Sequence, residues 1–262
     1  MNLKAFHVDA FTNKLFSGNP AVVVFLEEML SDRVLLNVAR ENGVPETAFV
    51  HKEGDIFYLR WFTPDVEMDL CGHATLASAH VIFTEMGFSG NEIPFETESG
   101  KLSVKRGSRG GYLLDFPVRE AVASVLPGDI RRSLNIDPIE IHKSRDYMLV
   151  FASRHDIETI TIDRFWFDKI NLDPGGVIVT APGNDCDFVS RFFTPQATIL
   201  EDPVTGSAHC TLAPYWGKRL GKKSLSAKQL SPRGGVIGCT LEGERVLIEG
   251  EAVTYAEIII NV

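Results

Sequence analysis

Apolar residues alternate with polar ones, or run together, in many short segments of the chain, and Gly, Pro and Asn separate these segments. Six of the segments have the pattern of β-strands, residues 3–11, 21–26, 47–51, 56–62, 101–106 and 111–116. The clearest amphipathic helix is predicted at residues 31–43, where Ser31 can cap the start and Gly43 can end the helix. The pattern therefore predicts many short strands and few helices.

A second helix is predicted within and behind the sequence DLCGHATLASAH, residues 69–80. It has almost no polar face, because apolar side chains are distributed all around it. They are Ala74, Leu76, Ala77, Ala79, Val81 and Ile82. A helix that is apolar all round must be covered on every side, and strands that close around it as a barrel would cover it. Cys71, Gly72 and His73 stand at its start, where Ser, Thr, Asp or Asn is usual.

The chain contains an internal repeat. The sequence RWFTP at residues 60–64 returns as RFFTP at residues 191–195, an offset of 131 residues. Each copy follows a predicted hairpin, with turns at Glu53–Gly54 and near Gly183–Asn184. Two copies of the same order of elements indicate two related halves.

A glycine at the start of an Ala-rich helix follows each copy of the repeat. Gly72 and Gly206 are 134 residues apart, so the second copy carries three extra residues, which we place within residues 196–204. We expect an α+β fold in which each of two pseudo-symmetric halves is a barrel-like sheet around one central helix.

The predicted halves are residues 1–116 and 117–251. The boundary follows from residues 115–128, where the strand pattern gives way to a connection marked by Pro and Gly. The last strand, residues 252–262, can return to the first half, because its apolar alternation needs a partner sheet. Residues 83–100 and 217–235 are interpreted as pocket-lining loops, and their sequences do not indicate which substrate binds.

Composition restricts the class of protein. The 262 residues are 44% hydrophobic and 23% charged, which is typical of an ordinary globular protein. The net charge of −9 argues against a nucleic-acid surface, and we interpret the basic residues 105–111 as a hairpin tip. The longest apolar run, residues 21–26, is far shorter than the ~20 residues of a membrane span.

The four cysteines have no CxxC spacing, which favours reduced thiols. Since no signal-peptide pattern is present either, we expect a cytoplasmic protein.

Two of three interpretations of the first helix start involve reactive side chains. Cys71 and His73, with His80 on the same helix face, could bind a metal, but a zinc site needs three or four ligands and the neighbouring sequence supplies no others. Cys71 could be a nucleophile with a pKa lowered by the helix N-terminus. A buried structural thiol is the more common fate of a free cysteine.

The third interpretation, which we favour, is an anion-binding site. The first amides of a helix lack internal partners and carry the positive end of the helix dipole. Gly72 and Gly206 would let a carboxylate approach these amides closely in a cleft between the halves. His73, Ser207 and Asp202 flank the two glycines.

Glu46 is the candidate general base for such a site. It stands between a proline and the predicted strand at residues 47–51. The corresponding region of the second half, residues 171–179, offers only Asp173. We therefore expect a base in one half only.

These motifs occur together, and in this order, in the PhzF family of phenazine biosynthesis-like isomerases, which the chain resembles over nearly its whole length. The segments that carry the resemblance are residues 7–23, 45–49, 60–79, 191–195 and 201–208. The resemblance implies the diaminopimelate epimerase fold, in which each of two pseudo-symmetric halves is a barrel-like sheet around a central helix. It also implies a site in the cleft between the halves, a homodimer, and neither a cofactor nor a metal.

The resemblance also assigns site residues. It implies that Glu46 shuttles the proton, with His73, Asp202 and Ser207 as further catalytic residues. Substrate-binding roles fall on Asn19, Gly72, Gly206, Thr205 and Cys71.

Pro45 stands where many family members have Ser, so a substrate hydrogen bond is lost and activity on the phenazine precursor is not implied.

Three functions stay open on the sequence. The first is a cofactor-independent isomerase that moves a proton between carbons of a small carboxylate through Glu46. The second is a two-base epimerase that uses Cys71. Such epimerases carry a cysteine before each helix-opening glycine, whereas this chain has Cys71 and Thr205 there. The third is a non-catalytic protein that binds a carboxylate.

Overall fold

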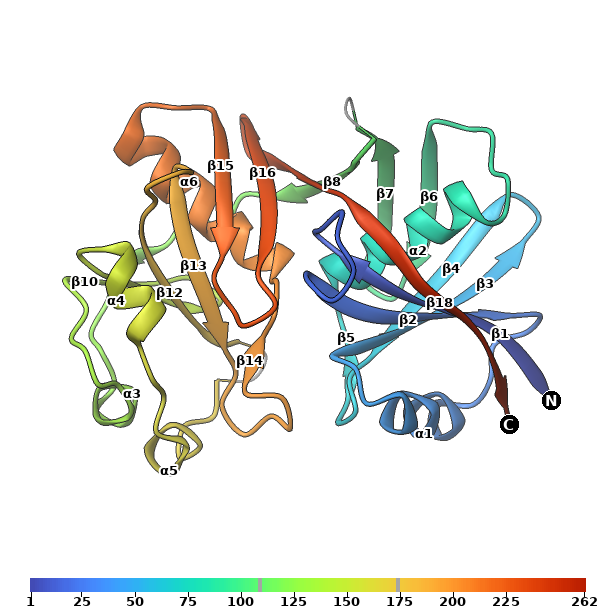
Figure 1. Ribbon diagram of the computed structural model, residues 1–262, viewed down its shortest axis with the longest axis horizontal. Helices are drawn as coiled ribbons and strands as arrows, with labels where there is room; N and C mark the ends of the chain where they lie inside the picture. Colours follow the sequence, from blue (N-terminus) through green and yellow to red (C-terminus); the bar gives the residue numbers. More distant parts are fainter. Residues whose placement is uncertain (108–109, 173–174) are drawn as a thin grey trace. The chain divides into compact units, whose positions relative to one another are not determined.

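The chain folds as two compact units that repeat one order of strands (Figure 1). The computed structural model describes residues 1–107, 110–172 and 175–262. The first unit consists of Met1–Asp115 with Ile248–Val262, and the second of Phe116–Leu247.

The strands of the first unit follow the order β18–β1–β2–β3–β4–β6–β7–β8. All neighbours are antiparallel except β2 with β3 and β4 with β6, and the short β5 pairs with the end of β4. The bounds are β1 (Asn2–Ala10), β2 (Asn19–Leu26), β3 (Glu46–Glu53), β4 (Ile56–Phe62), β5 (Glu67–Met68), β6 (Glu92–Thr97), β7 (Gly100–Arg106), β8 (Tyr112–Pro117) and β18 (Ala252–Asn261).

The second unit repeats this arrangement as β9–β10–β11–β12–β13–β15–β16. Its two parallel pairs, β11 with β12 and β13 with β15, occupy the same places in the order, and the short β14 again pairs with the end of β13. The bounds are β9 (Val122–Ala123), β10 (Glu140–Lys143), β11 (Tyr147–Val150), β12 (Val177–Pro182), β13 (Phe188–Phe193), β14 (Glu201–Asp202), β15 (Ser224–Gln229) and β16 (Gly235–Glu242). β17 (Arg245–Gly250) spans the point in the sequence where the second unit ends and the first resumes.

The repeat predicted from RWFTP and RFFTP extends to individual side chains. The guanidinium of Arg60 binds both carboxylate oxygens of Glu67 at 2.6 Å, and that of Arg191 binds Glu201 at 2.7 and 2.8 Å. The arginines are 131 residues apart and the glutamates 134. The three extra residues of the second copy therefore lie between Arg191 and Glu201, a stretch that overlaps the predicted segment at residues 196–200.

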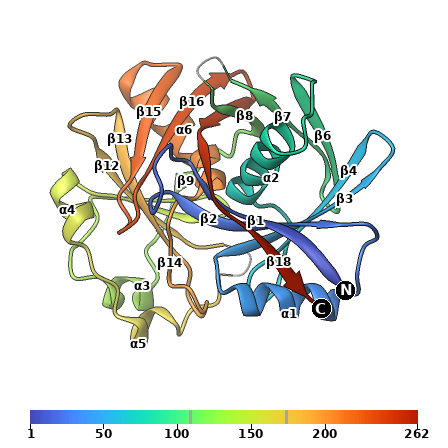
Figure 2. The ribbon, with the colours of Figure 1, turned by 45° about the vertical axis from the view of Figure 1, so that its right-hand side comes forward.

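Helix α2 (Gly72–Thr84) is the central helix of the first unit. Every residue from Gly72 to Phe83 is buried, and the helix contacts β1, β2, β3, β7 and β18 (Figure 2). Helix α1 (Asp32–Asn42) packs on the outer face, where its apolar stripe meets Phe49 and Phe62. Because side chains alternate along a strand, the neighbours of Phe49 and Phe62 in β3 and β4 point to the opposite face, which α2 covers.

The central helix of the second unit differs from that of the first. It begins as a 3₁₀ turn, η1 (Gly206–Ala208), and continues as α6 (His209–Leu220), whose last turn is exposed. Pro214 inside α6 has no N–H for the carbonyl of Cys210. The backbone N–H of Arg119 donates to that carbonyl instead, at 2.9 Å.

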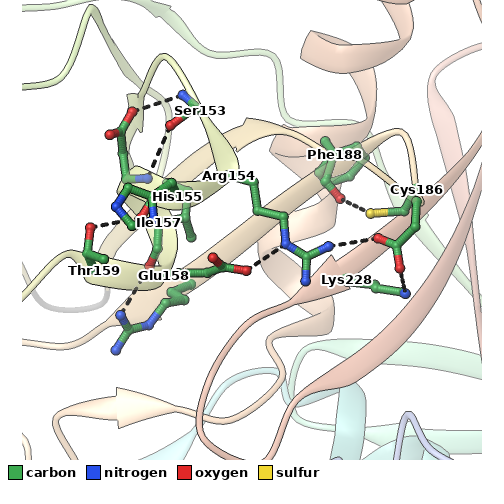
Figure 3. A network of polar contacts seen from close by, with 12 residues as sticks. Ser153, Arg154, His155, Ile157, Glu158, Thr159, Cys186, Phe188 and Lys228 are labelled. Carbon is green, nitrogen blue, oxygen red and sulfur yellow. Dashed lines mark hydrogen bonds and ion pairs between the residues drawn. The ribbon is translucent and has the colours of Figure 1, made fainter.

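Three further short helices, which the hydrophobic pattern does not predict, lie in the second unit. They are α3 (Gly128–Ser133), α4 (Arg154–Thr159) and α5 (Arg164–Phe167). Ser153 and Asp156 form a capping box at the start of α4, and Arg154 bonds to Glu158 and to Asp185 (Figure 3).

The interpretation of residues 83–100 and 217–235 as loops is wrong. The first stretch contains β6 and the second contains β15, each of which lies between two neighbouring strands of its sheet. Hydrogen bonds to a strand on each side stabilise β6 and β15. They therefore form strands although the apolar alternation of their own sequences is weak. The predicted hairpin tip at 105–111 joins β7 to β8, although residues 108–109 fall outside the described part of the chain.

The C-terminal strand β18 pairs along its whole length with β1, from Asn2 opposite Asn261 to Ala10 opposite Ala252. The two ends of the chain therefore lie side by side (Figure 1). Among the helices of the described residues, none combines the length and the hydropathy that crossing a membrane requires.

Buried His80 makes the stability of the protein sensitive to acid. Its Nδ1 lies 2.8 Å from the hydroxyl of Tyr112 and its Nε2 3.0 Å from that of Thr254, and burial lowers its pKa to about 4. The unfolded chain, with an ordinary histidine pKa of about 6.5, binds the proton more readily. This contribution to stability is therefore complete above about pH 6.5 and is lost as the pH falls toward 4.

We expect the free energy of unfolding at pH 5 to be lower than at pH 8 by about 2 kcal/mol on account of His80. Urea unfolding at both pH values measures the loss, and His80→Gln should reduce it by that amount. An equal loss in the variant and the wild type would contradict the prediction.

Candidate active site

Four polar side chains of the first unit meet at the start of α2. Glu46 begins β3, Asn19 begins β2, Cys71 precedes the helix, and His73 stands in its first turn. His73 is 3% exposed, and its Nε2 lies 3.0 Å from Oε2 of Glu46. Its Nδ1 lies 3.0 Å from Nδ2 of Asn19 and 3.5 Å from Sγ of Cys71. The structure thus brings together four of the residues predicted from the sequence.

The contacts of His73 assign its proton. In the neutral ring Nδ1 accepts from the Asn19 amide, and the proton is on Nε2. In the imidazolium both ring nitrogens carry a proton, so the Asn19 amide must turn its oxygen toward Nδ1. Nε2 is protonated in both forms and lies 3.0 Å from Oε2 of Glu46, outside the alignment of a hydrogen bond.

Burial and charge act on Cys71 and His73 in different ways. Burial raises the pKa of the Cys71 thiol to about 11, and the charge of Glu46 raises it further. Burial alone lowers the pKa of His73, but the charges of Cys71 and Glu46 raise it, and the net value is well above the ordinary one. Since the thiol is protonated at neutral pH, Glu46 is the anion that favours an imidazolium there.

The first turn of α2 could also hold a metal ion. One ligand atom from each of Glu46, Cys71 and His73 lies within 4.8 Å of the other two. The expectation that Cys71 and His73 have no further ligand nearby is therefore wrong, because β3 brings a carboxylate from 25 residues away in the sequence. Three donors of this kind match the ligand types of a zinc site with one open position.

The second unit carries its candidate residues on the turn between β14 and η1. Asp202 ends β14, Thr205 precedes the 3₁₀ turn, and Gly206 and Ser207 begin it. The hydroxyl of Thr205 donates to Oδ2 of Asp202 at 2.5 Å. Thr205 is nearly buried, whereas Asp202 and Ser207 are partly exposed.

The two helix starts share one side-chain contact, although the first begins as an α-helix and the second as a 3₁₀ turn. The carbonyl of Cys71 accepts from the hydroxyl of Thr75 at 2.5 Å, and the carbonyl of Thr205 accepts from Nδ1 of His209 at 2.9 Å. Thr75 and His209 each stand four residues after the accepting carbonyl. Burial lowers the pKa of His209 to about 4, so this ring is neutral at pH 7.

Strand register identifies the counterpart of Glu46 in the second unit. Thr47 pairs with Phe62 and Val177 with Phe193, so Glu46 and Gly176 are equivalent positions. A Cβ atom at Gly176 would lie 2.5 Å from the ring of Phe192 and 2.7 Å from the carbonyl oxygen of Phe193. The second unit therefore has no room for a carboxylate at this position. Asp173, the counterpart expected from the sequence, lies outside the described residues.

A surface pocket of about 590 Å³ in the first unit is separate from these residues. Its lining includes His51, Glu53, Tyr58 and Glu96. Glu53 and Glu46 are the two ends of β3, so the pocket lies at the end of the strand away from the candidate base.

Gln229 is a residue of the second site that the sequence analysis missed. It ends β15, is 1% exposed, and bonds to both Asp202 and Thr205. A glutamine in a segment with weak apolar alternation does not by itself indicate a site residue. The one indirect indication is that β15, which carries Gln229, occupies the same place in its sheet as β6 in the first unit.

Comparison with known proteins agrees with this architecture. A model of the phenazine biosynthesis-like proteins matches residues 8–258. The chain belongs to this family. An uncharacterized isomerase of Pseudomonas aeruginosa is 46% identical over 257 residues, which cover 98% of this chain and 97% of that protein.

Solved structures show the same fold. A PhzF-family protein of Enterococcus faecalis superposes with a TM-score of 0.94 at 42% identity, over 100% of both chains. A hydroxyproline epimerase of Agrobacterium vitis superposes with a TM-score of 0.63 at 12% identity, over 99% of this chain and 92% of the other. The second likeness shows the fold alone, which is α+β and of the epimerase type.

Proposed function

We propose that the protein is a cofactor-independent isomerase that moves a proton between two carbons of a small carboxylate substrate. In this proposal the helix start at Gly72 and the helix start at Gly206 supply the groups that bind the substrate. The observation that carries the proposal is the contact of buried His73 with partly buried Glu46 at the first of these starts.

Glu46 is the proposed acid and base. Its carboxylate takes a proton from a carbon beside the substrate carboxylate, and the electron pair of the broken C–H bond forms an enolate-like anion. Where a carbon–carbon double bond adjoins this anion, the same carboxyl group returns the proton to the far end of that double bond on the same face, and the double bond moves by one position. His73, whose pKa is raised well above its ordinary value by Cys71 and Glu46 despite its burial, supplies a positive charge beside the anion.

The helix starts are proposed to stabilise the negative charge. The unpaired first amides and the dipoles at Gly72 and Gly206 favour an anion. Asp202 and Ser207 orient the substrate from the second helix start. Preorganised donors of this kind act on the charge that develops during proton transfer.

Two features favour a single base over two. The position equivalent to Glu46 is Gly176, where no side chain fits. Of the two residues that precede the helix-opening glycines, one is a thiol with a raised pKa and the other is Thr205, whose hydroxyl is bonded to Asp202. A pair of thiolate and thiol on opposite faces of a carbon is therefore not favoured.

Solvent deuterium uptake into a panel of hydroxy- and amino-acid carboxylates, some of them β,γ-unsaturated, tests the proposal. We expect a product in which the double bond has moved and deuterium is on the carbon that received the proton. Deuterium with inversion at one carbon would instead support the epimerase. Binding of a carboxylate without any exchange would support a non-catalytic protein.

Cys71→Ser separates the one-base reaction from the two-base reaction. We expect the variant to keep most of its deuterium exchange, because the protonated thiol is not the base. If the thiol were one of two bases, the loss would be about 10²–10⁴-fold. Cys239→Ser, a buried thiol of β16, controls for the general cost of placing a hydroxyl in the interior.

A further inference from the structure

The geometry points to Gln229 as a positioning residue that holds Asp202 and Thr205 in the arrangement the reaction needs. No motif marks this residue, and it lies 24 positions beyond Thr205. The inference rests on the proposed function, since it assigns Gln229 a role through Asp202. Its physical basis is a set of three hydrogen bonds made by one buried amide.

The Gln229 side chain spans the turn between β14 and η1. Its Oε1 accepts from the backbone N–H of Thr205 at 2.9 Å. Its Nε2 donates to the backbone carbonyl of Asp202 at 2.7 Å and lies 3.3 Å from Oγ1 of Thr205. The amide therefore fixes both ends of a turn of four residues.

The orientation of the Gln229 amide is determined by its partners. If the oxygen and nitrogen were exchanged, Nε2 would face the N–H of Thr205 and Oε1 would face the carbonyl of Asp202, so both hydrogen bonds would be lost. In the observed orientation Oγ1 of Thr205 accepts from Gln229 and donates to Asp202. Gln229 thus acts on the Asp202 carboxylate through the threonine hydroxyl.

The strand that carries Gln229 is itself held in place. Lys228, the preceding residue, forms an ion pair with Asp185, which also binds Arg154 of α4 (Figure 3). Ser226 donates its backbone N–H to Asp187 at 2.8 Å. Because β15 is also paired on both sides, the backbone position from which the Gln229 side chain extends is fixed.

Ser231 offers a matched control on the same turn. Its hydroxyl donates to the carbonyl of Pro203 at 2.8 Å. Ser231 therefore also ties the 202–205 turn to the end of β15, but it bonds to neither Asp202 nor Thr205. A purely structural role for the Gln229 contacts predicts similar effects from both residues.

The test uses three variants of the full chain, Gln229→Met, Gln229→Glu and Ser231→Ala. The assay is deuterium exchange of the panel acid that the wild type exchanges fastest. Misplacement of a group by about 1 Å can cost 10²-fold in rate, so we expect Gln229→Met to lower kcat about 10- to 100-fold. Ser231→Ala should keep a kcat close to that of the wild type at a similar loss of thermal stability.

Gln229→Glu separates the bonds of the amide from one another. The new carboxylate can still accept from Thr205 N–H but cannot donate to Asp202 or Thr205. We expect normal protection of the Thr205 amide from hydrogen exchange, with kcat lowered as in Gln229→Met. A wild-type kcat in either Gln229 variant, or an equal loss in Ser231→Ala, would overturn the inference.

Amide hydrogen exchange keeps this inference distinct from the proposed function. In Gln229→Met the Thr205 amide should lose protection at least about tenfold relative to the wild type. A wild type that exchanges no panel acid would refute the proposed function and leave this readout in place. Unchanged protection of Thr205 in Gln229→Met would refute the positioning itself.

Discussion

Replacing Glu46 by glutamine is expected to slow deuterium exchange by about 10²–10⁴-fold, the usual cost of removing a general base. Glutamine has nearly the same shape, and its amide oxygen can take the place of the Glu46 oxygen that lies 3.0 Å from Nε2 of His73. The fold should therefore be preserved. NMR detection of deuterium in the panel acids measures the rate, and thermal unfolding checks the fold.

Glu53→Gln is the matched control. Glu53 ends the strand that Glu46 begins and is exposed, so the variant removes the same charge from the same strand away from the site. Its exchange rate should equal that of the wild type. A Glu46→Gln protein that exchanges protons as fast as this control would remove Glu46 from the mechanism.

Replacing Gly72 by valine is expected to weaken anion binding by at least about tenfold, which corresponds to about 1.4 kcal/mol. Gly72 is the first residue of α2 and does not adopt a positive φ, so a side chain is compatible with the backbone. The valine methyl groups would occupy the space next to the first amides, where the anion is proposed to bind. Titration with citrate at constant ionic strength, followed by the NMR shifts of the amides at 72–74, measures the dissociation constant.

Gly128→Val controls for the general effect of valine at the start of a helix. Gly128 begins α3 and also lacks a positive φ, but it is remote in sequence from every candidate site residue. Its affinity for citrate should equal that of the wild type. Equal affinities for all three proteins would contradict anion binding at Gly72, and amide shifts confined to other segments would place the anion elsewhere.

Local chemistry made much of the fold predictable. The RWFTP and RFFTP segments identify the repeat because each carries the same arginine, phenylalanine and turn residues, and these make the same ion pair and strand register in both units. The apolar sequence of α2 predicts its burial, since no face of it could be exposed at low cost. By contrast, β6 and β15 are stabilised by partners on both sides, which their own patterns do not reveal.

The sequence by itself determined the identities of the candidate residues, because helix starts, glycines and reactive side chains are local features. The tertiary structure alone decided which of these groups touch. Glu46 and His73 are 27 residues apart, and only the pairing of β3 beside the start of α2 gives their contact at 3.0 Å. Gln229 reaches Thr205 across 24 residues because β15 lies parallel to β13, and a long-range contact of this kind leaves no periodic trace in the sequence.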